Sequence, residues 1–224
     1  MKHTKRIGRI LADFVVIALM AVPSYAYQTI IPYPGNVHIV TMGDHIMNGY
    51  GMSVDQAFPE SLGRHLRLGG YARIQTMNVS DNNDTVLDAA EKVPKILGYN
   101  PHIVIISLGS NDAVQKRPLT QVYERLEYII KTFTDKKVKV ILAGVSPEFL
   151  KDEPYKTKMP QIYNYLAYKY QLEYYPNFLE GVEKRPIFLL PDGLHPNLRG
   201  TEMLAQNMKP VVEKLLSGMA IPKN

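Results

Sequence analysis

Four short polar segments of the chain contain residue types that carry out acid–base or nucleophilic chemistry in enzymes. They are Gly43–His45, Asn78–Thr85, Gly109–Asp112 and Asp192–Pro196. Two of the segments hold a histidine, the side chain that most readily exchanges a proton near neutral pH. Asp192 precedes His195 by three positions, a spacing that allows both side chains to meet from one loop. His45 and His195 could therefore act on a substrate as bases or nucleophiles.

The elements that must position these segments are strands that alternate with amphipathic helices. The expected strands are Val37–Met42, Ala72–Asn78, His102–Leu108, Val138–Ala143 and Leu172–Tyr175. The continuous β-branched run Ile103–Ile106 is typical of a strand covered on both faces, as in a parallel sheet. Helix spacing recurs over 122–133 and over 204–215, where Pro210 predicts a kink. This alternation predicts a three-layer α/β/α domain with a doubly wound, mostly parallel five-stranded sheet.

The polar segments occupy the positions where such sheets bind ligands. Gly43–His45 and Gly109–Asp112 each follow a predicted strand directly, and ligands of doubly wound sheets bind at the carboxyl ends of the strands. Each segment alone also has a structural interpretation, since Asn111 and Asp112 could cap a helix. The segment Lys151–Pro160, rich in lysine and proline, is expected to be a surface loop.

The four segments together resemble the sequence blocks of the SGNH/GDSL hydrolases. Gly43–His45 after its strand resembles Gly-Asp-Ser-Leu, and Asn78–Thr85 resembles Asn-x-x-x-Ser-Gly-Asp-Thr. Gly109–Asp112 matches Gly-x-Asn-Asp, and Asp192–Pro196 matches Asp-x-x-His-Pro. Each block alone is common, but four in order, each after the expected element, indicate the flavodoxin-like SGNH fold. The run Gly49–Ser53 is similar to the small periplasmic thioesterase and arylesterase branch.

The resemblance implies a role for each matching residue. His195 would be the base and Asp192 the carboxylate that orients it. The oxyanion hole would consist of the backbone N–H groups of His45 and Asn83 and the side-chain amide of Asn111. The substrate or ligand would be a small acyl ester, a thioester or an acetylated compound, and the family implies neither a cofactor nor a metal.

Two residues depart from the family pattern at the site itself. His45 stands where the family has its nucleophilic serine, so the hydroxyl that His195 would deprotonate is missing. Asn83 stands where the family has the oxyanion-hole glycine. The backbone N–H of Asn83 survives and asparagine tolerates left-handed backbone, but its side chain would narrow the pocket.

Three accounts of function follow from these departures. In the first, the covalent mechanism is impaired or lost and the site binds an acyl ligand. In the second, His45 attacks the substrate and forms an acyl-imidazole, or joins His195 in activating water. In the third, His45, His195 and Asp192 bind a metal ion, a ligand set that suits zinc. Other hydroxyl groups in the blocks stand away from the strand-end turn, and we expect none to replace the serine; they are Ser80, Thr85 and Ser110.

The amino terminus predicts export. Four basic residues precede an apolar run and a small-x-small motif ending at Ala26, which is the pattern of a cleaved secretory signal over residues 1–26. An uncleaved membrane anchor is the alternative, although Asp13 interrupts the apolar run. Cleavage would leave a short lead over 27–36, the domain over 37–217 and a tail over 218–224. We therefore expect a periplasmic or secreted protein that contacts the membrane only if the signal segment stays uncleaved.

Composition limits the possible partners. The full chain of 224 residues has a formal charge of +5, but without residues 1–26 it keeps 22 basic and 20 acidic residues, a formal charge of +2. This small charge, with no cluster of basic residues beside aromatics, does not support nucleic-acid binding. The chain contains no cysteine, so it is compatible with an oxidising compartment. We expect a monomer.

Overall fold

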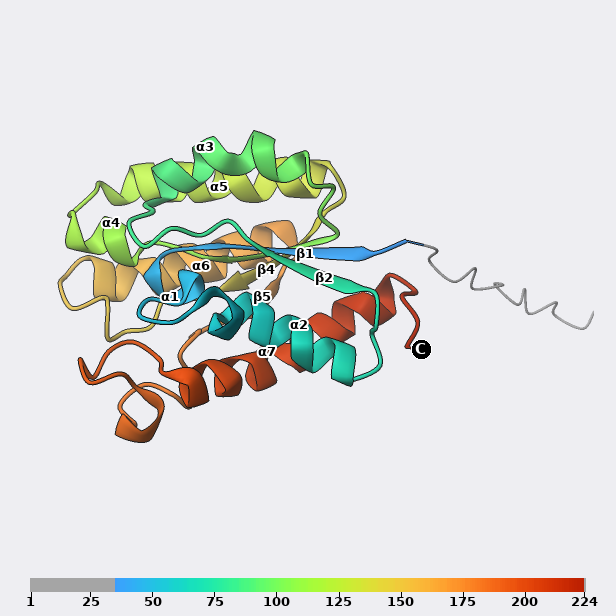
Figure 1. The fold of residues 1–224 in the computed structure, drawn as a ribbon. Coiled ribbons are helices and arrows are strands. Elements are labelled where there is room, and N and C mark those ends of the chain that lie inside the picture. Colours follow the sequence, from blue (N-terminus) through green and yellow to red (C-terminus); the bar gives the residue numbers. More distant parts are fainter. Residues whose placement is uncertain (1–34, 224) are drawn as a thin grey trace, which may run out of the picture. The chain divides into compact units, whose positions relative to one another are not determined.

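The computed structural model describes residues 35–223, and five parallel strands form the sheet at its centre. The predicted signal segment and most of the predicted lead lie outside the described residues. The strands are β1 (Val37–Gly43), β2 (Ile74–Asn78), β3 (Ile103–Ser107), β4 (Lys139–Ala143) and β5 (Glu173–Tyr175). Their order in the sheet is β2-β1-β3-β4-β5, with all neighbours parallel (Figure 1). The predicted doubly wound α/β sheet is therefore confirmed, and all of its strand pairs are parallel.

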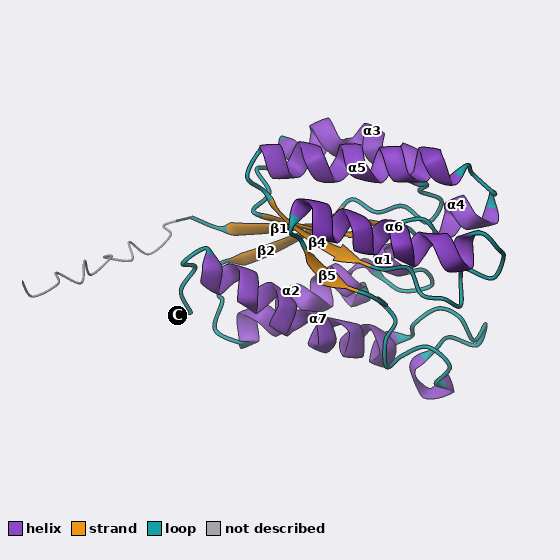
Figure 2. Ribbon diagram, turned by 180° about the vertical axis from the view of Figure 1, so that it is seen from behind, coloured by secondary structure: helices purple, strands orange, loops and turns teal. Residues whose placement is uncertain are grey.

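Helices cover both faces of the sheet, which completes the three predicted layers (Figures 1 and 2). One face carries α3 (Val86–Leu97), α5 (Leu119–Asp135) and α6 (Tyr155–Tyr170). The other face carries α2 (Phe58–Leu68) and α7 (Leu198–Gly218), which continues through Pro210. Four short helices lie in the connections: α1 (His45–Asn48), α4 (Ser110–Val114) and the 3-10 helices Val54–Gln56 and Pro186–Phe188.

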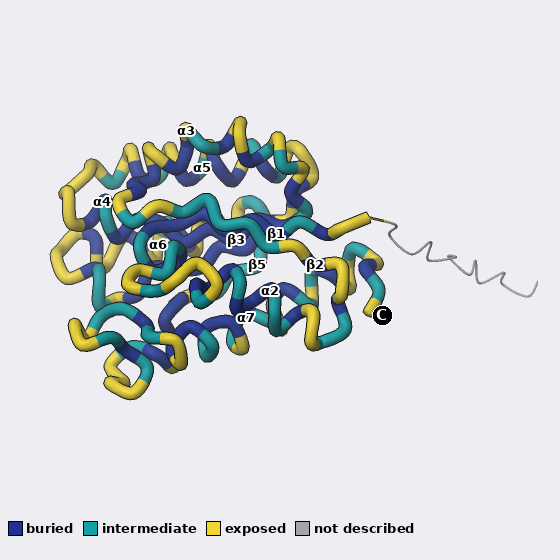
Figure 3. The backbone as a smooth tube through the Cα atoms, viewed as in Figure 1, coloured by how far each residue is buried: buried dark blue, intermediate teal, exposed yellow. Residues whose placement is uncertain are grey.

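Successive side chains along each strand point to opposite faces of the sheet, and this alternation divides the core into two apolar clusters. Val104 and Ile106 of β3 face the cluster under α3, α5 and α6, while Ile103 and Ile105 face the cluster under α2 and α7. Every residue of β3 is buried, as expected for a central parallel strand (Figure 3). Because both faces are fully packed, the strand ends are held at fixed positions.

The predicted surface loop over Lys151–Pro160 is correct only in its first part. Helix α6 begins at Tyr155, and both Tyr155 and Met159 are buried in the core. Helix α6 continues through Pro160, although proline has no N–H to donate to the carbonyl of Lys156 one turn earlier. Within residues 35–223, no helix is long and apolar enough to cross a membrane.

The strand order places a topological switch point between β1 and β3. From β1 the chain proceeds to β2 on one side, and after β2 it returns to β3 on the other side. The connections at this point run to opposite sides of the sheet, so a crevice forms at the carboxyl ends of the two strands. Gly43–His45 leaves β1 and Gly109–Asp112 follows β3 at this crevice.

One buried carboxyl group near the crevice makes stability depend on pH. Asp112 is 1% exposed, and its Oδ2 accepts a hydrogen bond of 3.0 Å from the backbone N–H of Val86 at the start of α3. Burial raises the pKa of Asp112 to about 6, against an ordinary value of 3.8. The folded protein therefore retains a proton that the unfolded chain loses between these two values. This contribution to stability is fully present below the ordinary pKa and is lost as the pH rises through about 6.

We predict that Asp112→Asn removes most of this dependence, because the amide oxygen can accept the bond from Val86 without carrying charge. The free energy of unfolding of the parent, relative to the variant, should fall by up to about 3 kcal/mol between about pH 4 and pH 7. Urea unfolding across this range measures the difference. The exposed Asp55→Asn serves as the control, and a parent and Asp112→Asn that respond to pH in parallel would contradict the prediction.

Candidate active site

The backbone at the switch point brings the two strand-end segments together. Gly109, between β3 and α4, adopts a φ of +116°, a conformation that glycine adopts readily. A Cβ atom built at Gly109 would meet only the Cε at the flexible end of the Met159 side chain, which can shift. The turn therefore depends on glycine for its conformation. It directs Ser110, the first residue of α4, towards Asp44 and His45 after β1.

Asp192 and His195 meet from one loop, as their spacing predicts. Oδ2 of Asp192 lies 2.8 Å from Nδ1 of His195. Oδ1 of Asp192 accepts hydrogen bonds from the backbone N–H groups of Leu194 and His195, at 2.9 Å and 3.0 Å. Although burial works against ionisation, these hydrogen bonds and the one from the His195 ring hold the pKa of Asp192 below its ordinary value. The carboxylate thus stays ionised and fixes the orientation of the His195 ring.

His45 places its ring between His195 and Ser110. Nδ1 of His45 lies 3.1 Å from Nε2 of His195, the nitrogen on the opposite side of the ring from Asp192. Nε2 of His45 lies 3.0 Å from Oγ of Ser110. The Ser110 hydroxyl in turn contacts the buried carboxylate of Asp44. Both nitrogens of His45 are therefore used in contacts with the protein.

Aromatic rings hold the two histidines in place. Phe149 packs against His45 with 4.9 Å between the ring centroids, and Tyr50 packs against His195 with 4.2 Å. Burial lowers the pKa of His45, the carboxylate of Asp44 raises it, and the neighbouring His195 lowers it again. The net effect is a lower pKa than that of an ordinary histidine, which favours a neutral ring at neutral pH.

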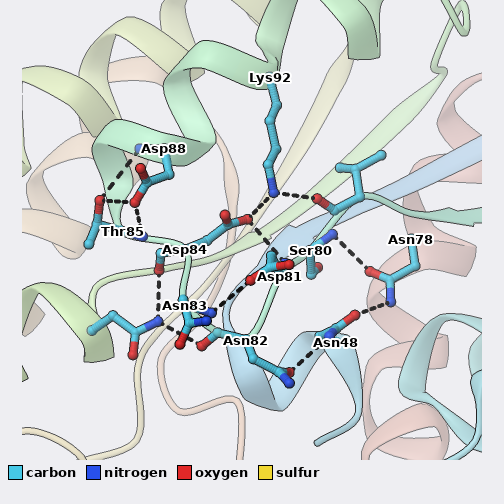
Figure 4. Close-up of polar contacts among 12 residues, drawn as sticks. Asn48, Asn78, Ser80, Asp81, Asn82, Asn83, Asp84, Thr85, Asp88 and Lys92 are labelled. Carbon is cyan, nitrogen blue, oxygen red and sulfur yellow. Dashed lines mark hydrogen bonds and ion pairs between the residues drawn. The ribbon is translucent and has the colours of Figure 1, made fainter.

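Two of the three predicted oxyanion-hole donors already have acceptors inside the protein (Figure 4). The Asn111 side-chain amide donates to the backbone carbonyl oxygens of Asn82 and Asp84, at 3.0 Å and 2.9 Å. These two bonds use both of its amide hydrogens. The backbone N–H of Asn83 donates to Oδ1 of Asp81 at 3.0 Å, within its own loop. A substrate oxygen would have to displace these acceptors to be stabilised by either group.

Further contacts stabilise this arrangement of the 78–85 loop. Asn48 of α1 donates to the side-chain oxygen of Asn82 at 2.8 Å and accepts from Asn78 at 3.2 Å (Figure 4). Nζ of Lys92 donates to the Val79 carbonyl at 3.2 Å and forms an ion pair with Asp84, which contacts the Asp81 backbone. Thr85, one of the hydroxyls considered above, caps α3 in a capping box with Asp88. The loop is held from both of its ends.

A cleft of about 400 Å³ lies next to residues that adjoin the two histidines, although neither histidine lines it. Phe149 and Leu194 line it, and these residues also contact His45 or precede His195. The remaining lining residues are Ala113, Val114, Glu148, Lys151 and Asp152. Its size falls within the range of small-molecule sites, and its walls are apolar next to the histidines.

The metal site considered from the sequence does not fit this geometry. Asp192 contacts Nδ1 of His195, whereas His45 contacts Nε2, so the three side chains do not converge on one point. Among residues 35–223, no group of three or more histidine, cysteine or acidic side chains is placed to hold a metal ion.

The sequence does not predict the contacts that Ser110, Phe149 and Tyr50 make at the site. Ser110 is not expected to replace the serine because it stands away from the strand-end turn, and the structure places its Oγ 3.0 Å from Nε2 of His45. The available signal was its position after β3, since neighbouring parallel strands end at the same edge. No sequence pattern marks Phe149, whose loop reaches the site only in the folded chain.

We predict that Asn111→Ala destabilises the protein by about 1–3 kcal/mol, because two carbonyl groups of the 78–85 loop lose their donor. Urea unfolding measures the change. Asn207→Ala is the control, since its amide donates to one backbone carbonyl, that of Glu180 at 3.0 Å, and otherwise contacts Tyr175, so its loss should cost under about 1 kcal/mol. Equal effects of the two substitutions would show that Asn111 does not hold the loop.

Comparison with known proteins identifies the family of the chain. Residues 41–203 match the GDSL-like Lipase/Acylhydrolase family. The chain is 27% identical to the arylesterase of Vibrio mimicus and 26% identical to the esterase TesA of Pseudomonas aeruginosa, over 75% and 80% of its length and 84% and 89% of theirs. The crystal structure of TesA superposes with a TM-score of 0.73 at 26% identity, covering 80% of this chain and 99% of that one. The SGNH-hydrolase family esterase AlinE4 superposes with a TM-score of 0.64 at 28% identity, covering 81% and 97%. The chain therefore belongs to the GDSL-like lipase/acylhydrolase family.

Proposed function

We propose that this protein is an exported, monomeric member of the family that binds a small acyl ester or thioester without hydrolysing it through a covalent acyl-enzyme. The relatives carry the names arylesterase and esterase, which suggests the ligand class. The cleft beside the histidines supports the same class, because an acyl chain would pack on Phe149 and Leu194. Export rests on the sequence pattern of residues 1–26.

The contact between His45 and His195 is the observation that carries this proposal. In a serine hydrolase, the base nitrogen faces the nucleophile hydroxyl and takes its proton. Here the corresponding nitrogen of His195, Nε2, faces a ring nitrogen of His45 at 3.1 Å. The ring of His45 thus stands in place of the hydroxyl, and its contact with Nε2 of His195 keeps this nitrogen from accepting a proton from another group.

The nucleophile position and the oxyanion-hole donors are likewise occupied by contacts within the protein. A histidine nucleophile needs an accessible lone pair, but both nitrogens of His45 face protein atoms, Ser110 Oγ at 3.0 Å and His195 Nε2 at 3.1 Å. The donors of Asn83 and Asn111 are bonded to protein oxygens, and one such donor is worth about 10²–10³ in kcat. Loss of a triad serine alone leaves only about 10³–10⁴-fold catalysis over water. Loss of these donors as well would remove most of what remains.

One observation favours the second candidate, an esterase that uses His45. Burial lowers the pKa of His45, so its ring is largely neutral at neutral pH, as a nucleophile must be. If the contact with His195 opened, Nδ1 of His45 could attack a carbonyl carbon. This candidate predicts that His45→Ala abolishes hydrolysis.

We predict that the parent protein forms no covalent adduct with a fluorophosphonate, whereas His45→Ser forms a stoichiometric adduct at position 45, because the substitution restores a hydroxyl next to His195. Mass spectrometry of the intact protein and its peptides measures labelling. His45→Ala is the control and should hydrolyse nitrophenyl acetate within about twofold of the parent rate. A loss of tenfold or more in His45→Ala would establish His45 as catalytic and would overturn the proposal.

We further predict that Asp81→Ala increases the esterase activity of His45→Ser. The substitution removes the acceptor that holds the Asn83 N–H, so this donor becomes available to a substrate oxygen. The kcat of the double variant should exceed that of His45→Ser by about ten- to hundredfold.

The matched control is the exposed Asp55→Ala in the same His45→Ser background, which should leave kcat unchanged. In the parent background, Asp81→Ala should leave hydrolysis at its original level. If Asp81→Ala and Asp55→Ala have equal effects in His45→Ser, the Asn83 donor is not what limits that variant.

A further inference from the structure

Five polar groups form one unbroken chain across the candidate site. It runs from the carboxylate of Asp192 through the rings of His195 and His45 to the hydroxyl of Ser110 and the carboxylate of Asp44. Both ends are carboxylates, which accept hydrogen bonds when ionised and donate none. The protons available between the ends therefore decide how many of the four contacts can be hydrogen bonds.

This row of five polar groups needs one more proton than its neutral members supply. Each of the four contacts requires one hydrogen to be a hydrogen bond. A neutral histidine carries one ring N–H and a serine one O–H, so His195, His45 and Ser110 supply three. All four bonds form only when a fourth proton is present, on one of the rings or on an end carboxylate.

We propose that one excess proton locks the contact between His45 and His195, and that its loss at higher pH opens this contact and frees Nε2 of His195. This inference rests on the proposed function, because it treats His195 as a base that the locked site withholds. The opened site would present a lone pair of His195 to water or to a bound ligand.

Without the excess proton, the contact between His45 and His195 is the one that loses its hydrogen bond, because the other groups are fixed more firmly. Ser110 and Asp44 are 2% and 3% exposed and lie at the ends of β3 and β1, so their contact is fixed by the sheet. Without the excess proton, Ser110 still donates to Asp44, and His45 still donates from Nε2 to Ser110. His195 still donates from Nδ1 to Asp192. Two lone pairs then face each other between Nδ1 of His45 and Nε2 of His195, at 3.1 Å.

The loop that carries His195 is the part of the site that can move when the excess proton is lost. Asp192 is exposed, and Tyr50, which packs on His195, is 46% exposed. The other titratable or charged groups around the chain are Asp112 of α4, Tyr163 of α6, and Glu148, Lys151 and Asp152 of the cleft. Burial and the neighbouring His195 oppose a proton on His45, whereas the carboxylate of Asp44 favours it, and the net effect is a lowered pKa of His45.

Asp44→Asn tests the proton count directly. Oδ1 of Asp44 accepts from the backbone N–H of Ile46 at 3.4 Å, and Oδ2 contacts Ser110. This bond orients an asparagine so that its amide nitrogen faces Ser110 and supplies the fourth hydrogen permanently. The Ser110 hydroxyl then donates to Nε2 of His45, and His45 donates from Nδ1 to His195. All four bonds form with both rings neutral.

The measurement is the tautomer of each ring, obtained from two-bond ¹H–¹⁵N correlations of the full chain with ¹⁵N-labelled histidine between about pH 5 and pH 9. The chain contains six histidines, and His45→Gln and His195→Gln assign the two signals of interest. We expect the parent at high pH to hold His45 mainly as the Nε2–H tautomer and His195 as the Nδ1–H tautomer. In Asp44→Asn, His45 should be mainly the Nδ1–H tautomer at the same pH.

Ser110→Ala provides a second route to the same result if Asp44→Asn folds poorly. Without the Ser110 hydroxyl, the row of hydrogen-bonded groups ends at His45. Only the contacts of Asp192 with His195 and of His195 with His45 remain, and the two neutral rings supply the hydrogen for each. His45 should again be mainly the Nδ1–H tautomer at high pH. His65→Gln, which alters a histidine bonded at 2.7 Å to Glu202, is the control and should leave both signals unchanged.

An Nδ1–H tautomer of His45 in the parent at high pH, unchanged by either substitution, would overturn the inference. Two independent titrations of the rings would also overturn it. The experiment uses no substrate, so it is separate from the test of the proposed function. A parent protein labelled by fluorophosphonate would refute the proposed function and leave the tautomers as measured.

Discussion

The structure of the site depends on one contact, in which Nδ1 of His45 lies 3.1 Å from Nε2 of His195. It links the loop after β1 to the loop that precedes α7, two segments that are 150 residues apart in the sequence. A serine at position 45 could contact His195 only through one oxygen, which a substrate can replace. The imidazole ring instead contacts His195 with one nitrogen and Ser110 with the other. The imidazole ring at position 45 therefore joins the two loops in one network of polar contacts.

The fold explains why the Asp44 and Ser110 end of this network is fixed. β1 and β3 are neighbours at the centre of the sheet, and both faces are covered by helices (Figures 1 and 2). Their carboxyl ends bring Asp44 and Ser110 together as buried groups. On the other side of the site, the 78–85 loop is held by Asn111 and Asn48 (Figure 4). Buried polar groups are costly to leave without partners, so each element of the site stabilises the arrangement of the next.

Much of the fold and part of the site could be predicted from the sequence. Strand positions followed from β-branched runs such as Ile103–Ile106, because a central parallel strand is apolar on both faces. The meeting of Asp192 and His195 followed from their spacing within one loop. The beginning of α6 at Tyr155 did not follow, because the lysine and proline content of this stretch is typical of loops and tertiary packing decides its helix.

The remaining features of the site depend on contacts between distant residues. Asn111 reaches carbonyl groups 27 and 29 positions away, and Ser110 reaches His45 from 65 positions away. Local sequence preferences cannot specify such pairs, which are set by strand register and loop geometry. The sequence could identify Asn83 and Asn111 as donors, but it could not show that protein oxygens already accept from them.

The most direct test of the account is a ¹⁵N–¹⁵N coupling across the hydrogen bond between His45 and His195. A coupling of this kind is observed only when two nitrogens share a hydrogen, so it detects the bond itself. In the parent protein below the titration of the pair, the account predicts a resolved coupling between Nδ1 of His45 and Nε2 of His195. Absence of this coupling across the whole pH range, in a protein whose other histidine signals show it to be folded, would contradict the account.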